Sequence, residues 1–324
     1  MIELRSVIKQ FIKVLRQQYL RKLLLWIFAL ASYGYLIYIL LYHQNYNELF
    51  FQFKQISWQQ YPWLLLVFGL LPANILTESI KWKQLISGTE KLSIGQSLKS
   101  VLAGFSSGFF TPNRSGEFAG RILFLKDGHR KAGIVYSFIN SLTQNFVMAL
   151  VGIPATVLLF SVKANNTQVL LPKYLICVGF LAVLMIVFYF SFPAIARNKK
   201  LNNRFSFLQD IGTYNISKLL QILAISLFRY LIFTTQMFAM LLFWGIDINL
   251  WQAALAIPTT YLFVTFTPSL AFAEAAVRGS YAAIFIGIFA HQPAAVAFAG
   301  MCLWAVNSGI PVIVGNAIVG LKRI

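Results

Sequence analysis

The sequence predicts an all-α polytopic membrane protein, with about six spanning helices and two broken re-entrant helical hairpins that form an inverted repeat. Three observations lead to this prediction. Of the 324 residues, 58% are hydrophobic and only 11% are charged, whereas a soluble domain carries about 25% charged residues. Several apolar runs reach about 20 residues, the length that a helix needs to cross a bilayer. A motif containing proline, glutamate and arginine also occurs once in each half of the chain.

The order of apolar and charged segments predicts the individual elements. Residues 1–22 mix Lys and Arg with regularly spaced apolar side chains, which is typical of a basic amphipathic helix on the membrane surface. Residues 23–324 then form a single transmembrane domain, because no polar stretch is long enough for a soluble one. Within it we expect six spanning helices, at residues 23–42, 61–80, 133–161, 172–192, 219–244 and 294–320.

Two other apolar regions are interrupted in the middle. Residues 97–110 span only about 21 Å as a helix, and a Thr-Pro-Asn-Arg-Ser-Gly turn follows before the pattern resumes at Glu117. We therefore predict a hairpin of two half-length helices over residues 97–126. Residues 251–290 break at residues 268–273, and each half reaches about 25 Å. This second region forms either another hairpin or two thin spans.

The positive charges are distributed unevenly over this layout. The formal net charge of +18 would favour nucleic-acid binding in a soluble protein. If the N-terminus is cytoplasmic and the hairpins enter from opposite faces, 21 of the 27 Lys and Arg lie inside and three lie outside. This bias agrees with the positive-inside rule. The basic composition is therefore assigned to topology and anionic lipid headgroups, with both termini cytoplasmic and no role for nucleic acid.

The two interruptions share a sequence motif. Each consists of Phe-Thr-Pro, a turn of four or five residues, a glutamate and, four positions later, an arginine. The copies are Phe110-Thr111-Pro112, Glu117 and Arg121, and Phe266-Thr267-Pro268, Glu274 and Arg278. The two prolines lie 156 residues apart. Hairpins that enter from opposite faces are the arrangement found in inverted-repeat transporters.

The charged pairs in these motifs favour a polar cavity. On an exposed helix, a Glu–Arg pair four residues apart stabilises by only about 0.2–0.5 kcal/mol. At the bilayer centre, each charge is unfavourable by about 2.5–3.5 kcal/mol. Two such pairs at helix breaks therefore indicate a functional cavity, with structural stapling of the hairpins as the alternative. The candidate substrate-binding residues are Arg114, Glu117, Arg121, Arg229, Glu274 and Arg278.

Other polar residues are spaced to face the same cavity in a supporting role. Asn74, Glu78 and Lys81 lie on one face of the second span. Lys81 is near the cytoplasmic end, so it either joins this stripe or extends to the membrane surface. Arg229 lies ten residues into an apolar run of 26, with Gln236 further along the same face. Arg229 is either a substrate ligand or a staple that binds backbone carbonyls.

No catalytic centre is visible in the sequence. It contains neither a G-x-x-x-x-G-K-[ST] nor a G-x-G-x-x-G phosphate loop, and it has no H-E-x-x-H motif and no cluster of Cys and His. We therefore expect no catalytic residue, no cofactor and no metal site.

The first motif and its surroundings resemble a known family. Residues 109–121, which read Phe-Phe-Thr-Pro-Asn-Arg-Ser-Gly-Glu-Phe-Ala-Gly-Arg, are similar to an element of the lysylphosphatidylglycerol synthase transmembrane, or flippase-like, family. Residues 267–274 and the Lys81-Trp82 pair resemble two further elements. The resemblance covers nearly the whole chain in order and spacing. It implies a bacterial or archaeal inner-membrane protein that moves lipids or lipid-linked sugars between leaflets.

The chain also departs from the pattern of this family. Aminoacyl-lipid synthases in the family carry an additional soluble catalytic domain, whereas this chain ends at Ile324 without one, so synthase activity is not expected. The second turn has Ser269-Leu270-Ala271-Phe272 where a glycine-rich turn is usual. Asn140 and Gln144 stand where charged residues are common. We expect them to hydrogen-bond between helices rather than contact a ligand.

These observations lead to one main functional hypothesis and two alternatives. We expect a bacterial inner-membrane protein that translocates an anionic phospholipid or a polyprenyl-linked lipid through a polar site at the bilayer midplane. Its partners would be lipids with anionic headgroups, together with further copies of the chain or a partner enzyme. The alternatives are a membrane-embedded enzyme and a membrane subunit or scaffold for a lipid-modifying or glycosyl-transferring enzyme.

Overall fold

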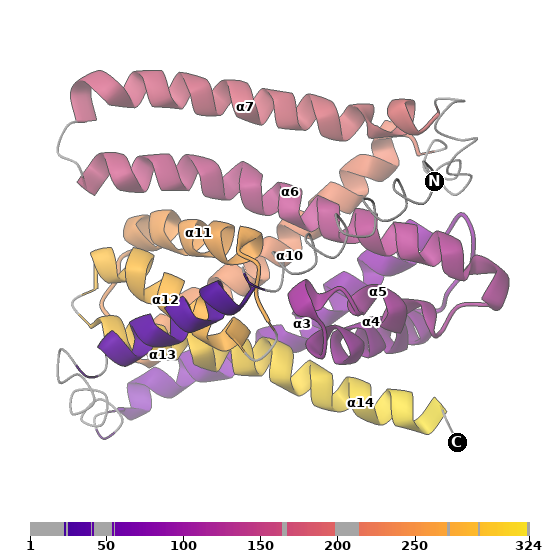
Figure 1. Ribbon diagram of the computed structural model, residues 1–324, viewed down its shortest axis with the longest axis horizontal. Helices are drawn as coiled ribbons and strands as arrows, with labels where there is room; N and C mark the ends of the chain where they lie inside the picture. Colours follow the sequence, from indigo (N-terminus) through magenta and orange to yellow (C-terminus); the bar gives the residue numbers. More distant parts are fainter. Residues whose placement is uncertain are drawn as a thin grey trace, which may run out of the picture.

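The computed structural model describes residues 25–39, 56–163, 167–197, 214–270, 273–290 and 292–322, together with positions 23, 41 and 54. In this part of the chain every regular element is a helix (Figure 1). The basic amphipathic helix expected at residues 1–22 lies outside the described residues.

Within the described residues, four helical segments are long and apolar enough to cross a membrane, namely Trp58–Ile86, Asp127–Val162, Ile216–Phe243 and Pro293–Leu321. They correspond to α3 (Tyr61–Ile86), α6 (Arg130–Lys163), α10 (Ile216–Phe243) and α13 (Pro293–Trp304). The last of these continues through the π-helical turn η7 (Ala305–Gly309) into α14 (Ile310–Lys322). Four of the six predicted spans are thereby confirmed as long apolar helices. The other two coincide with the shorter apolar helices Leu25–Ile39 and Ile176–Ser191, the latter within α7 (Thr167–Ala196).

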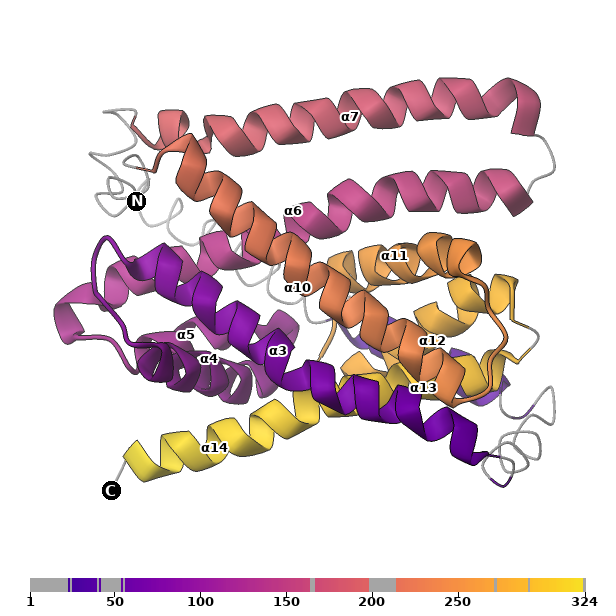
Figure 2. The same cartoon turned by 180° about the vertical axis from the view of Figure 1, so that it is seen from behind.

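Both predicted breaks are present as interruptions between helices. The first separates α4 (Ile94–Phe109) from α5 (Glu117–Ile122), with the short turn η2 (Pro112–Arg114) between them. The second separates α11 (Leu250–Phe266) from α12 (Glu274–Phe285). With 16 and 17 residues, α4 and α11 reach about 24 and 26 Å. The two broken pairs lie towards opposite ends of the molecule in both views (Figures 1 and 2).

A polar layer separates two apolar clusters of the core. On α3, Asn74 and Glu78 are buried between Leu71 of the larger cluster and Trp82 of the smaller one. On α10, Arg229 lies midway along the helix, and residues of both clusters lie on either side of it. Arg229 therefore lies at about half the length of α10, and Glu78 lies in the second half of α3. Both helices are long enough to cross a bilayer.

The close approach of α5 to α4 depends on Gly120. A Cβ atom at this position would overlap backbone atoms of Ala103 and the hydroxyl of Ser107. One turn before Ala103 in α4, the hydroxyl of Ser100 donates a hydrogen bond of 2.5 Å to the carbonyl oxygen of Arg121. The close contact between α4 and α5 thus fixes the position of the Arg121 backbone, from which its side chain extends.

We expect Gly120→Ala to lower the free energy of unfolding by about 1–3 kcal/mol, as overpacking of a close contact does. Thermal unfolding of the purified protein measures this. Gly128→Ala is the matched control, because a Cβ at Gly128 would have no atom of the described residues within 4 Å. Equal melting temperatures for the two variants would contradict the role assigned to Gly120.

Candidate functional site

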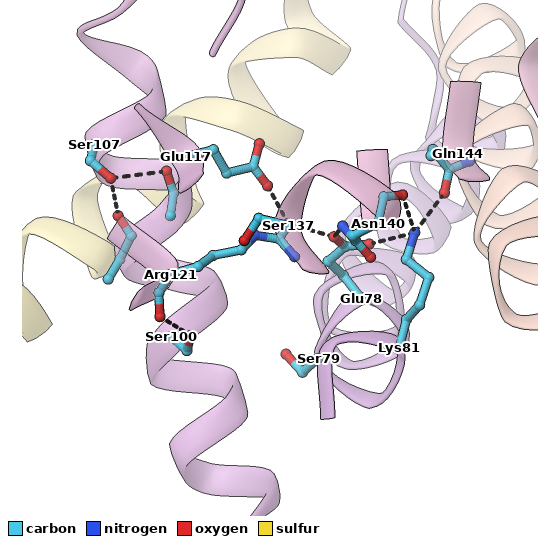
Figure 3. A network of polar contacts seen from close by, with 12 residues as sticks. Glu78, Ser79, Lys81, Ser100, Ser107, Glu117, Arg121, Ser137, Asn140 and Gln144 are labelled. Carbon is cyan, nitrogen blue, oxygen red and sulfur yellow. Dashed lines mark hydrogen bonds and ion pairs between the residues drawn. The ribbon is translucent and has the colours of Figure 1, made fainter. Parts of the chain in front are cut away.

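The carboxylate of Glu78 is the centre of a buried ionic cluster (Figure 3). Its Oε1 accepts hydrogen bonds from Arg121 and from Asn140, both at 2.5 Å. Its Oε2 lies 3.3 Å from the ammonium of Lys81 and accepts a hydrogen bond of 2.8 Å from Arg229. A carboxylate has about four acceptor positions. All of them are occupied by partners from four different helices, so Glu78 holds α3, α5, α6 and α10 together.

Lys81 is enclosed by the helices rather than extended to the membrane surface. Its side chain has no exposed area, and its ammonium reaches the carbonyl oxygen of Asn140 and the Oε1 of Gln144, each at 3.4 Å (Figure 3). The alternative in which Lys81 extends to the surface is therefore wrong. The reason is that Glu78 lies one turn away on the same face and offers a stronger partner than water at the helix end.

Arg121 joins the first hairpin to this cluster. Its guanidinium binds both Glu117, four residues earlier on α5, and Glu78 on α3. It also lies 5.5 Å from the ring of Trp82, within range of a cation–π contact. Two of its guanidinium nitrogens have no hydrogen-bond partner among the described residues. Arg121 is 1% exposed. It therefore holds the two carboxylates in place from inside the helix packing.

A second ionic cluster joins the two hairpins. Glu274, the first residue of α12, binds Arg278 at 2.9 Å and Arg114 of the first break at 3.1 Å. Arg114 also donates a hydrogen bond of 2.5 Å to the hydroxyl of Ser308 in the π-helical turn. π-Helical turns are frequent at functional sites. Here the π-helical turn η7 brings Ser308 to Arg114. The guanidinium of Arg114 thereby links η2 to η7 and, through the carboxylate of Glu274, to α12.

The tips of the two breaks meet through equivalent residues. Asn113 and Ser269 each follow the proline of their motif. The backbone N–H of Asn113 donates to the carbonyl oxygen of Ser269 at 3.1 Å, and the N–H of Ser269 donates to the side-chain oxygen of Asn113 at 2.8 Å. Asn113 and Arg114 have φ angles of 51° and 54°, a conformation that asparagine tolerates better than arginine. The strained turn aims Arg114 at the second hairpin.

The two ionic clusters border a cavity of about 530 Å³, which adjoins a smaller one of about 140 Å³. Three arginines line both cavities, namely Arg114, Arg229 and Arg278. Their side chains are 29%, 17% and 27% exposed, so they face open space, whereas Lys81 and Arg121 are enclosed behind the wall. Glu78, Glu117 and Glu274 line the larger cavity, and Asn74 the smaller one.

The charges of the two clusters do not cancel. They contain five cationic and three anionic side chains, which are Lys81, Arg114, Arg121, Arg229, Arg278, Glu78, Glu117 and Glu274. Buried charges are normally paired, because an unpaired ion in a medium of low dielectric is strongly unfavourable. An excess of two positive charges therefore makes the cavity complementary to an anion.

The structure brings together nine of the ten residues singled out in the sequence. Arg229 binds the side chains of Asn74, at 2.8 Å, and Glu78, so its hydrogen bonds do not match those of a staple for backbone carbonyls. Gln236 lies apart from the cavity: its amide donates to the carbonyl oxygen of Val67 at 2.9 Å and accepts from Asn307 at 3.0 Å.

For four residues that line the cavities, the sequence predicted either no role or a role other than contact with the ligand. Asn140 and Gln144 do bond between helices, as expected, but both also line the larger cavity. Their spacing of four residues was the available signal. Ser308 and Asn307 line the smaller cavity. The sequence around them gives no signal of a site, because it is an apolar segment with normal helical periodicity. The π-helical turn that presents them is visible only in the structure.

Together, the long apolar helices and the charged layer buried between them define a multi-pass membrane protein. The model of a family described as the lysylphosphatidylglycerol synthase TM region matches residues 25–315. The chain belongs to this family, as its motifs indicated. No curated protein matches it.

Proposed function

We propose that this protein carries an anionic phospholipid or a polyprenyl-linked lipid between the leaflets of the bacterial inner membrane, through the cavity between the two breaks. The observation that carries the proposal is the excess of two positive charges around a cavity between the spanning helices, with Arg229 at the middle of α10. A lipid phosphate supplies the missing negative charge. Its tail stays in hydrocarbon while its headgroup crosses.

The roles of the residues follow from where they lie. Arg114, Arg229 and Arg278 line the cavity and can each form two parallel hydrogen bonds to a phosphate group. Glu274 holds two of these guanidinium groups in position and Glu78 holds the third. Arg121, which lines neither cavity, positions Glu117 and Glu78. No bond is made or broken in this function.

The proposed topology places both termini in the cytoplasm and lets the two hairpins enter from opposite faces. The location of α4 and α5 towards one end of the molecule, and of α11 and α12 towards the other, supports it. The contact between Asn113 and Ser269, equivalent in the two motifs, then lies close to an approximate two-fold axis. Such an axis in the membrane plane relates the halves of inverted-repeat transporters.

The test is lipid transfer in proteoliposomes. A fluorescent phosphatidylglycerol or polyprenyl phosphate is placed in one leaflet, and its appearance in the other is followed with a membrane-impermeant quencher. We expect Arg278→Gln to slow transfer at least about tenfold, since a hydrogen bond to a charged group contributes about 1.5–3 kcal/mol. The fold should survive, because Glu274 keeps Arg114 as a partner.

The matched control is Lys83→Gln, which removes a cation from the exposed side of α3 and should leave transfer unchanged. Two results would overturn the proposal. One is transfer by the wild type no faster than in empty vesicles for any of the anionic lipids. The other is transfer by a folded Arg278→Gln variant at the wild-type rate.

A further inference from the structure

We infer that the hydrocarbon tail of the transported lipid is held in a separate apolar groove beside the polar cavity, between α6 and α7. The inference rests on the proposed function and names the part of the substrate that the charged clusters do not contact. It gives the protein two adjoining subsites, one for a phosphate-containing headgroup and one for part of a single acyl or isoprenoid chain.

The groove has a volume of about 260 Å³, near the lower limit of about 300 Å³ for small-molecule pockets. Its walls are formed by Phe146 and Ala149 of α6, Met185, Phe188 and Tyr189 of α7, and Leu219 of α10. Phe188 is 57% exposed, so the groove opens towards the surface of the helix bundle, where lipid chains lie. A space of this size has room for a stretch of one chain.

The hydroxyl groups in the groove wall already have partners. Thr143 donates to the carbonyl oxygen of Ile139 at 2.9 Å, and the hydroxyl of Tyr189 donates to the carbonyl oxygen of Leu219 at 3.2 Å. The hydroxyl of Tyr214 donates likewise to Leu85, at 2.6 Å. These groups therefore offer no donor to a headgroup, and the groove suits hydrocarbon.

The groove and the polar cavity share one wall. Leu142, Asn145 and Phe266 line both of them. Phe266 ends α11 at the second break and is 58% exposed. A ligand that lies in both spaces must change from charged to apolar at this wall. A phospholipid or a polyprenyl phosphate has that change of character between its phosphate and its chain, whereas a free phosphate or a soluble metabolite does not.

The energetics indicate what such a groove contributes. Lipid tails are as apolar as the side chains of the protein, so moving a chain from the bilayer into the groove gives little hydrophobic free energy. The groove therefore acts by orientation. It keeps one chain beside α6 while the arginines hold the phosphate. It also limits how bulky that chain can be.

The test is photo-crosslinking of the full-length protein in bilayer nanodiscs, with a phosphatidylglycerol that carries a diazirine on one acyl chain. The expected product is a label on Ala149, which is only 6% exposed and thus shielded from bulk lipid. The label should decrease when unlabelled phosphatidylglycerol is added. Binding of glycerol phosphate, measured by calorimetry, reports the headgroup subsite on its own.

Met185→Trp fills the groove and should reduce the label on Ala149 at least about tenfold, with glycerol phosphate bound as by the wild type. Val183→Trp is the matched control: it lies on the same helix, is 57% exposed, and should change neither measurement. If Met185→Trp does not fold, Ala149→Leu narrows the groove from the facing wall, and the label on Phe146 is then scored.

Equal labelling of folded Met185→Trp and wild type, or labels confined to exposed residues, would overturn the inference and leave the proposed function standing. A different set of results would rule out the proposed function. In that case the wild type binds no glycerol phosphate, and a neutral diacylglycerol probe labels Ala149 as strongly as the charged lipid does. The groove would then hold chains without any link to a headgroup, and the two-subsite inference would also be wrong.

Discussion

Replacing Glu78 by glutamine is expected to lower the free energy of unfolding by about 3–5 kcal/mol, the range found when one partner of a buried ion pair is removed. The glutamine keeps the shape of the side chain but not its charge. Lys81, Arg121 and Arg229 would then lose their common counter-ion. Among the described residues, Arg121 alone of these three has a second carboxylate partner, that of Glu117. Thermal unfolding in detergent measures the effect.

Two further variants separate this electrostatic cause from a general effect of substitution. Asp127→Asn removes a carboxylate from an exposed ion pair with Arg130, and such pairs contribute about 0–1 kcal/mol. Adding Lys81→Met to Glu78→Gln removes one of the stranded cations and should recover part of the stability. A Glu78→Gln protein as stable as Asp127→Asn would show that the cluster does not hold the helices together.

The two hairpins should be energetically coupled through Arg114 and Glu274, as a double-mutant cycle of Arg114→Gln and Glu274→Gln measures. Glu274→Gln alone leaves Arg114 and Arg278 side by side as like charges, because both bind the same carboxylate. Removing Arg114 as well relieves this repulsion. We therefore expect a coupling free energy of about 0.5–3 kcal/mol for stability, typical of residues in contact, and a non-additive loss of lipid transfer.

The cycle for Asp127 and Arg130 provides the reference. That pair is formed between neighbours on the surface, with side chains 87% and 44% exposed, and its coupling should stay near the lower end of about 0.2–1 kcal/mol. Additivity of Arg114→Gln and Glu274→Gln within about 0.5 kcal/mol, for stability as well as transfer, would mean that the hairpins act independently. A single anion site shared by both breaks would then be excluded.

Much of the fold could be predicted because its signals are local. An apolar run of about 20 residues can be identified without reference to any other segment. Pro112 and Pro268 lie one or two residues after a helix C-cap, a position where proline is common because it cannot continue the helix. The pairs Glu117–Arg121 and Glu274–Arg278 are neighbours on one helix, and both form as their spacing predicts. The repetition of the motif likewise needs only a comparison of the chain with itself.

The partners across the site could not be predicted in the same way. Glu78 is four residues from Asn74 but 43 from Arg121, 62 from Asn140 and 151 from Arg229. Helical periodicity shows which face of a helix carries these side chains, and it contains no information on which other helix that face meets. For the same reason Lys81, whose position near a helix end favoured the membrane surface, is in fact completely buried.

The sequence by itself thus determined the helical membrane class, the family, the positions of the breaks and the identity of most charged residues in the site. Only the tertiary structure decided that Glu78, rather than a residue of either motif, is the common counter-ion, and that Arg114 reaches Glu274 across the two hairpins. The physical reason is that an ionic contact forms within about 4 Å. The crossing of packed helices sets such distances, and the spacing of residues along one chain does not.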